Sequence, residues 1–379
     1  MPTIRIYGLD ILRAAAILFV LRLHSFIFTP LPLRKYSNFL YVDGVTLFFV
    51  LSGFLIGQII LKTYDRKRFN IRQLTQFWYR RWMRTLPAFY VTISLLFLYE
   101  YFHHTIPYNG RVFKTFIFSQ CFSAGNTDFF REGWSLSVEE WFYLLIPFSL
   151  SVLHYYFNIP WKKLLIGAII FVIVLTEVVI SLKLKRMPYL NNRTANGETA
   201  FNINIKSITY LRFETLMIGV LAAYLFYYKK RIWEYKNFWF WSGIVLFIII
   251  PFASKYLNSY RIKLSGEAIA TLFLLPKLNS IKTDKGLIYQ IVTYISLISY
   301  SLYLLNYSAF HAVVMPFYDK YWFQYYGTNT YFSFAFLLYF GWAFLAASMM
   351  YYLIEKPFMR LRDKNVGSVM LKYKRKKGP

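Results

Sequence analysis

The chain has 379 residues, of which 57% are hydrophobic and only 16% are charged, whereas a soluble globular chain carries about 25% charged residues. Its formal net charge is +27, but the basic residues flank long apolar runs, so the charge indicates contact with anionic membrane lipids and argues against nucleic-acid binding. The single cysteine, Cys121, excludes an intrachain disulfide and a cysteine-based metal cluster.

Apolar stretches along the chain predict an all-α protein, a polytopic bundle of about ten transmembrane helices. The predicted spans are residues 11–28, 42–61, 86–102, 134–157, 164–182, 208–228, 238–256, 264–275, 287–314 and 331–354. The eighth is the shortest. One further apolar piece, residues 112–122, is too short to cross a bilayer, so we expect it to lie in the interface or to re-enter the membrane.

Ten spans place both termini on one side of the membrane, and most of the 44 lysines and arginines then lie on that side as well. The positive-inside rule assigns that side to the cytoplasm. The basic and aromatic segment 62–84 is predicted to be an interfacial helix on the cytoplasmic side. We expect a membrane-embedded domain over residues 1–356 and a basic cytoplasmic tail over residues 357–379.

The first span contains ionisable side chains, which are costly inside a membrane and therefore indicate function. Arg13 and His24 are eleven residues apart, so they share one helix face at a separation of about 16 Å along the axis. Asp10 precedes Arg13 by three residues and is expected to pair with it. Arg22 points to another side and is expected to reach the outer headgroups. A lone membrane histidine is more often a packing residue than a catalyst, and the shared face shifts that balance only modestly.

Two adjacent carboxylates, Glu139 and Glu140, lie in the segment GWSLSVEEWFY that opens the fourth predicted span. Acidic residues suit a helix N-terminus, where Ser135 or Ser137 is expected to act as the cap. The same segment places a carboxylate at the outer end of a span, which is the level expected for His24. A carboxylate beside an imidazole can orient the ring and raise its basicity, so both interpretations stay open.

Two further groups of charges lie near or within spans. Arg81 and Arg84, which follow Arg80, are one turn apart just before the third span, where they either anchor the inner leaflet or clamp phosphate groups. Arg212 and Glu214 lie in the sixth span, and a structural ion pair explains them at least as well as a functional role.

Five segments, in this order and with this spacing, resemble the bacterial membrane acyltransferase family 3, whose members O-acylate surface sugars, peptidoglycan and some small molecules. The segments extend from residue 9 to residue 305, nearly the whole membrane part. They are LDILR through LRLH (9–24), LFFVLSGFLI (47–56), RRWMRTLP (80–87), WSLSVEE through Tyr143, and ISYSLYLL (298–305).

The resemblance implies an acyl-CoA donor, usually acetyl-CoA, that is used from the cytoplasmic side. It implies that His24 and Arg13 correspond to the essential pair of the family. It further implies that Arg81 and Arg84 are the arginine motif, and that Glu139 is the acidic residue of the tryptophan-serine motif.

The chain departs from the family pattern at two positions. Members of the family often carry histidine where this chain has Asn306, so that position cannot supply a second base. Arg22 is an unexpected charge in the first span. Some relatives carry an extra extracytoplasmic esterase-like domain, and we expect none here because only about two dozen residues follow the last predicted span.

Together with this resemblance, the sequence predicts an enzyme of the bacterial inner membrane that moves an acetyl group from acyl-CoA to a hydroxyl of a cell-surface sugar or polysaccharide, without a metal. In this hypothesis His24 is the general base, oriented by Glu139. Arg13 stabilises the developing oxyanion or holds the pantetheine arm. Arg81 and Arg84 bind the CoA phosphates. Direct transfer and a ping-pong route through an acyl-histidine both stay open.

A transporter or flippase of a glycan or lipid-linked sugar is the alternative, because charges inside a membrane also suit substrate pathways. The absence of an internal repeat in the sequence argues against this alternative.

Overall fold

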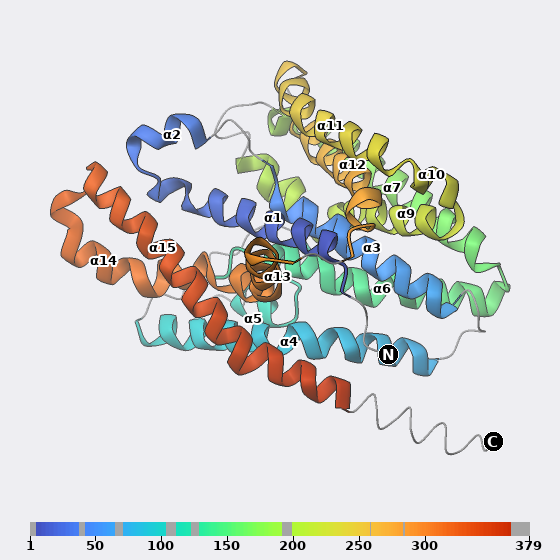
Figure 1. The fold of residues 1–379 in the computed structure, drawn as a ribbon, viewed down its shortest axis with the longest axis horizontal. Coiled ribbons are helices and arrows are strands. Elements are labelled where there is room, and N and C mark those ends of the chain that lie inside the picture. Colours follow the sequence, from blue (N-terminus) through green and yellow to red (C-terminus); the bar gives the residue numbers. More distant parts are fainter. Residues whose placement is uncertain are drawn as a thin grey trace. The chain divides into compact units, whose positions relative to one another are not determined.

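The computed structural model describes residues 5–37, 42–64, 71–103, 111–122, 129–191, 199–257, 259–282 and 285–364. Over these ranges the chain consists of helices and connecting turns without a strand, which confirms the predicted all-α class (Figure 1). Nine helices within them are long and apolar enough to cross a membrane, so the chain is a multi-pass membrane protein. Most of the predicted basic tail lies after residue 364 and therefore outside the described residues.

The chain divides into two compact units. The first comprises Met1–Ile27, Pro32–Phe69 and Tyr108–Ser296. The second comprises Phe28–Leu31, Asn70–Pro107 and Leu297–Pro379.

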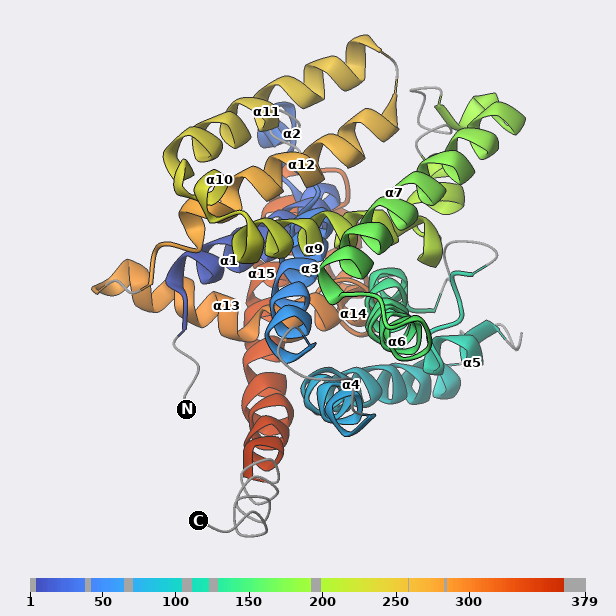
Figure 2. The ribbon, with the colours of Figure 1, turned by 90° about the vertical axis from the view of Figure 1, so that its right-hand side faces the viewer.

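The first unit is built around α3. It contains α1 (Tyr7–His24), most of α2 (Leu31–Ser37), α3 (Gly44–Tyr64), α5 (Arg111–Phe116), α6 (Gly133–Phe157), α7 (Trp161–Arg186), α9 (Phe213–Tyr228), α10 (Lys230–Glu234), α11 (Lys236–Tyr256), α12 (Tyr260–Leu278) and the first half of α13 (Leu287–Leu305). Helices α1, α9 and α12 all pack against α3, and α7 packs against α9. Helices α11 and α12 lie side by side (Figure 2).

Helices α3 and α9 approach each other closely at glycines. A Cβ atom at Gly53 would overlap the carbonyl oxygen of Leu216, and a Cβ atom at Gly219 would overlap that of Val50. Gly57 follows Gly53 by four residues and also faces α9. Small residues at this spacing allow helix backbones to pack tightly within a membrane. The contact therefore fixes the register of the two helices and the positions of the polar residues at their ends.

The eighth predicted span forms α12, which has 19 residues. It is not among the nine apolar helices, because it carries several charged residues, including Glu267. It nevertheless packs against α1, α3, α9 and α11. With its 19 residues it is the tenth helix of comparable length in the part of the chain that the structure describes.

The second unit contains α4 (Ile71–Phe102), the rest of α13, α14 (Met315–Trp322) and α15 (Asn329–Met350). Helix α4 runs without a break for 32 residues, so residues 71–84 of the segment predicted to be an interfacial helix are helical and continue directly into the third predicted span. Pro87 lies inside α4, where it removes one backbone donor. Neighbouring groups in a membrane protein can satisfy the freed carbonyl, so the helix continues through the proline.

The ninth predicted span, residues 287–314, is interrupted. Helix α13 ends at Leu305, because the Asn306 side chain donates hydrogen bonds from Nδ2 to the carbonyls of Leu302 and Tyr303, both at 2.8 Å. Such side-chain bonds compete with the next helical turn. The prediction of one continuous helix over this range was therefore wrong.

Three segments within the described ranges are π-helical. They are η3 (Asn202–Lys206), η5 (Phe310–Val314) and η7 (Tyr351–Glu355). A π-turn holds one residue more than an α-turn, and such turns are frequent at functional sites. Each of the three contains an ionisable side chain: Lys206, His311 and Glu355.

Candidate functional site

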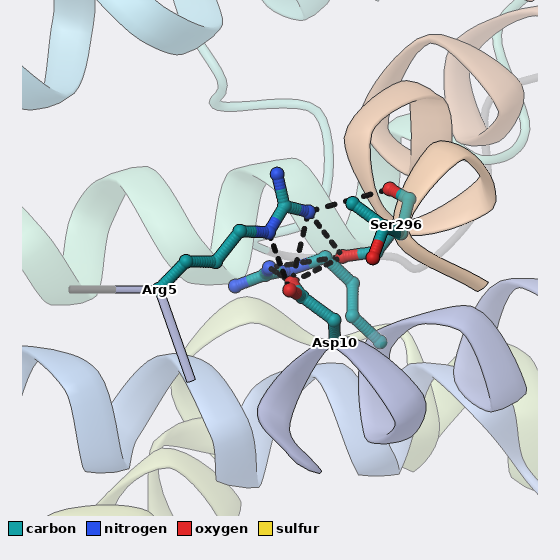
Figure 3. Close-up of polar contacts among 5 residues, drawn as sticks. Arg5, Asp10 and Ser296 are labelled. Atoms are coloured by element: carbon teal, nitrogen blue, oxygen red, sulfur yellow. Dashed lines mark hydrogen bonds and ion pairs between the residues drawn. The ribbon is translucent and has the colours of Figure 1, made fainter. Parts of the chain in front are cut away.

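Four side chains join the N-terminal part of α1 to α13 within the first unit. Asp10 is 3% exposed and lies at the centre of this group (Figure 3). Its Oδ1 accepts hydrogen bonds from Arg13 Nη1 at 3.2 Å and from Ser296 Oγ at 2.7 Å. Arg5 forms an ion pair with the same carboxylate and also donates from Nη2 to Oδ1 at 3.0 Å. The predicted pairing of Asp10 with Arg13 is confirmed.

The Asp10 carboxylate therefore anchors Arg13. The Ser296 hydroxyl also accepts a hydrogen bond from Arg13 Nη1 at 3.2 Å, so the guanidinium is held from two helices. Sequence reasoning missed Arg5 and Ser296. Arg5 precedes the first apolar stretch, and Ser296 is separated from Asp10 by 286 residues, so only tertiary packing brings it close.

His24 is the last residue of α1 and is half-buried. The chain continues from it into a 3-10 turn, η1 (Ser25–Phe28). Because Arg13 and His24 lie on one uninterrupted helix, their predicted shared face and separation of about 16 Å follow from helix geometry.

Glu139 lies in the second turn of α6 and is half-buried. Its Oε1 accepts a hydrogen bond from Ser52 Oγ at 2.8 Å. Ser52 belongs to α3, which packs against both α1 and α6. Sequence reasoning had not given Ser52 a role, although it lies in the segment LFFVLSGFLI. The pairing of Glu139 with His24 stays a prediction.

The tryptophan-serine segment holds a turn that follows α5. Phe118 has a φ of 56°, which is uncommon for a residue other than glycine. Its carbonyl accepts hydrogen bonds from Ser137 Oγ and from Trp141 Nε1, the latter at 3.0 Å. The prediction that Ser135 or Ser137 caps α6 was wrong, because no side chain caps this helix and both hydroxyls donate to loop carbonyls.

Arg81 and Arg84 lie on α4 in the second unit, and both are half-buried. The charge of Arg84 acts on the carboxylate of Glu355, which is 2% exposed. Ser301 Oγ donates a hydrogen bond to the same carboxylate. Sequence reasoning missed Glu355, which lies one residue after the last predicted span and has no motif around it.

A second buried polar group, here called the Arg212 cluster, lies where α3 and α9 begin. It comprises Asp43, Thr46, Lys206, Arg212, Glu214 and Glu267. Asp43 forms an ion pair with Lys206 at 3.1 Å and accepts a hydrogen bond from Thr46 Oγ1 at 3.0 Å. Thr46 Oγ1 in turn accepts from Arg212 Nη2 at 2.9 Å.

The predicted pair of Arg212 and Glu214 is thus part of a larger network, because Asp43 and Glu267 also act electrostatically on Arg212. Sequence reasoning missed Asp43, which lies at the start of the second predicted span, and Glu267, which lies in the shortest one.

Fold and site together define a polytopic membrane protein that holds ionisable side chains inside a helical bundle, a class that includes both enzymes and transporters. The family model described as an acyltransferase domain matches residues 6–352, nearly the whole chain. The chain belongs to this acyltransferase family, which confirms the resemblance seen in its five sequence segments.

Several named proteins are similar to this chain. Peptidoglycan O-acetyltransferase OatA of Listeria monocytogenes is 34% identical over 163 residues, which cover 38% of this chain and 24% of that protein. A protein of Staphylococcus aureus (strain COL), provisionally named an O-acetyltransferase, is 29% identical over 348 residues, which cover 83% of this chain and 51% of that protein. YrhL of Bacillus subtilis, provisionally named a peptidoglycan O-acetyltransferase, is 34% identical over 166 residues, which cover 38% of this chain and 24% of that protein.

The matched region spans about half of the S. aureus relative and about a quarter of the other two. No solved structure matches the chain.

Proposed function

We propose that this protein is an O-acetyltransferase of the bacterial cytoplasmic membrane, which moves an acetyl group from acetyl-CoA to a hydroxyl of a cell-surface sugar or polysaccharide. The observation that carries the proposal is one helix, α1, which holds an anchored arginine and a histidine in a chain of the acyltransferase family. The names of the relatives support the acetyl group and the cell-envelope acceptor.

The reaction requires a base, because a hydroxyl is a poor nucleophile until its proton is removed. His24 takes this proton as the hydroxyl oxygen attacks the thioester carbon, which contributes typically 10²–10⁴-fold to the rate. The new C–O bond forms, the C–S bond breaks, and the proton passes to the departing CoA sulfur. Glu139 orients the imidazole in this scheme.

Arg13 serves the donor in this scheme. It is anchored to Asp10 and lies three helical turns from His24, so it is better placed to hold the pantetheine arm than to stabilise an oxyanion beside the histidine. Arg81 and Arg84 bind the CoA phosphates, which guanidinium groups match in shape and charge.

Purified protein supplied with acetyl-CoA labelled in the acetyl group tests the proposal. We expect release of free CoA and transfer of the label to glycan fragments from the cell wall. A transporter or flippase would consume no acetyl-CoA, and that result would refute the proposal. Mass spectrometry of surface glycans from cells with and without the gene should show a difference of one acetyl unit per modified sugar.

A further inference from the structure

Arg212 is the bulkiest side chain that is fully buried among the described residues, yet its hydrogen bonds are incomplete. Its Nη2 donates to Thr46, whereas Nε and Nη1 have no hydrogen-bond partner within the described part of the chain. Glu267 is 1% exposed, and its Oε2 accepts a hydrogen bond from the Asp43 N–H at 3.0 Å. Its Oε1 likewise has no partner among the described residues. Unsatisfied buried polar atoms require a specific explanation.

The formal charges of the groups around these atoms cancel. The carboxylates of the Arg212 cluster are matched by an equal number of cations, because Lys263 also acts on Glu267. These groups are Asp43, Glu214 and Glu267 on one side and Lys206, Lys263 and Arg212 on the other. An anion would meet the carboxylates and a cation would meet the arginine, so a neutral ligand fits the cluster best.

A hydroxyl group can satisfy either kind of unpaired atom. It accepts a hydrogen bond from an arginine N–H and donates one to a carboxylate oxygen. We propose that the Arg212 cluster binds hydroxyl groups of the acceptor sugar, with Arg212 as the donor and Glu267 as the acceptor. This inference rests on the proposed function, to which it adds a place for the acceptor.

The start of α3, where Asp43 lies, packs against the half of α1 that ends at His24. Gly44, next to Asp43, packs directly on α1, since a Cβ atom there would overlap the carbonyl oxygen of Ala16 and lie 2.9 Å from Val20 Cγ2. Val20 precedes His24 by four residues, which is about 6 Å along the helix. In this proposal a sugar held by the cluster presents a neighbouring hydroxyl to His24, which ends the half of α1 on which Gly44 packs.

A half-buried aromatic ring borders the cluster. The Trp134 ring lies 5.9 Å from Lys206 Nζ and packs edge-on against Phe49, whose own ring is 5.5 Å from the Arg212 guanidinium. Ligand sites commonly combine such an apolar ring with a few placed polar groups. Part of Trp134 stays exposed, so it offers a surface for the apolar face of a sugar.

Binding measurements on the full chain in detergent test this site. The probe is a set of fluorescently labelled peptidoglycan glycan fragments of two to four sugars, released by muramidase. In Glu267→Gln an amide N–H₂ can replace the unpaired oxygen, and in Arg212→Lys the Nε–H is lost. We expect either change to weaken glycan binding by roughly 10-fold or more, because a buried polar group loses its partner.

Glu177→Gln is the matched control. It also removes a carboxylate from the first unit, but that carboxylate pairs with Arg261 and is partly exposed, so glycan affinity should be unchanged. If the buried variants do not accumulate, Lys206→Gln at the partly exposed edge of the cluster should weaken binding in the same direction.

The proposed acceptor site is wrong if the wild type, Glu267→Gln and Lys206→Gln bind the glycan with equal affinity. It is also wrong if the wild type consumes acetyl-CoA but binds no glycan. A single buried water could satisfy the same atoms instead of a sugar. In that case glycan binding would not depend on Glu267. Glu267-dependent binding without acetyl-CoA consumption would instead refute the proposed function alone.

Discussion

At the scale of single residues, the Asp10 carboxylate is the main anchor of the N-terminal part of α1. It is buried and takes hydrogen bonds from two arginines and a serine. Breaking a buried pair leaves an uncompensated charge, so the loss of the Asp10 carboxylate should displace both arginines.

Changes at Asp10 and Ser296 should therefore lower transfer activity in a graded way. Ser296→Ala removes the interhelical hydrogen bonds with Asp10 and Arg13, each worth about 0.6 kcal/mol within a membrane, which together correspond to roughly a 3- to 8-fold loss in rate. Asp10→Asn removes the charge that holds Arg13 and should cost more than 10-fold. Initial rates at matched expression measure both. Ser296→Thr keeps the hydroxyl and serves as control, and equal rates in Ser296→Ala and Ser296→Thr would contradict the anchoring role.

His24 should be indispensable for transfer but not for folding. A general base acts in the transition state, so His24→Gln, which keeps polarity and approximate size, should lose at least about 100-fold in rate while acetyl-CoA binding stays nearly intact. Arg22→Gln, two residues away, should keep most activity. Near-wild-type transfer by His24→Gln would show that this histidine only makes a structural hydrogen bond.

Donor binding should depend on Arg81 and Arg84. Each charge-assisted hydrogen bond to phosphate contributes about 1.5–3 kcal/mol, so the double change to alanine should weaken acetyl-CoA binding by at least about 10-fold. Arg80→Ala is the control, because Arg80 is exposed on the same helix. Isothermal titration of purified variants measures the affinity for acetyl-CoA. An unchanged affinity would show that Arg81 and Arg84 do not bind the donor and would favour their role as lipid anchors.

At the scale of helices, the contact of α3 with α9 depends on glycine. A methyl group at Gly53 overlaps a backbone carbonyl, so Gly53→Ala forces the helices apart and should destabilise the protein by about 1–3 kcal/mol. Gly167 lies in α7 with no atom within 4 Å of an added Cβ, and Gly167→Ala should be neutral or slightly stabilising. Thermal unfolding in detergent compares the two, and equal melting temperatures would contradict the packing argument.

The sequence predicts what is local and leaves open what depends on distant contacts. Most spans are predictable, because a bilayer requires long apolar helices. The Asp10–Arg13 pair is predictable, because the two residues are one turn apart. The contact with Ser296 and the break at Asn306 are not, since they depend on tertiary packing and on a side chain that competes with the backbone. The hydrogen bond of Glu267 with the Asp43 N–H is likewise not predictable, because the two residues are 224 positions apart in the sequence.

At the scale of the whole molecule, the orientation in the membrane follows from the positive charges and is still a prediction. Reporter fusions after Lys62 and at the C-terminus should report the cytoplasm. A fusion near Asn196, outside the described residues, should report the opposite side. A cytoplasmic signal at Asn196 would contradict the arrangement of ten spans.

The π-helical segment Tyr351–Glu355 sets the rotational phase of the helix that contains it. One residue of an α-helix corresponds to a rotation of about 100°, so deleting a single residue here would restore an α-turn and swing Glu355 away from Ser301. Chain length at this point is therefore constrained as tightly as residue identity. An insertion or deletion in this turn would damage the surroundings of Arg84 even if every named side chain were kept.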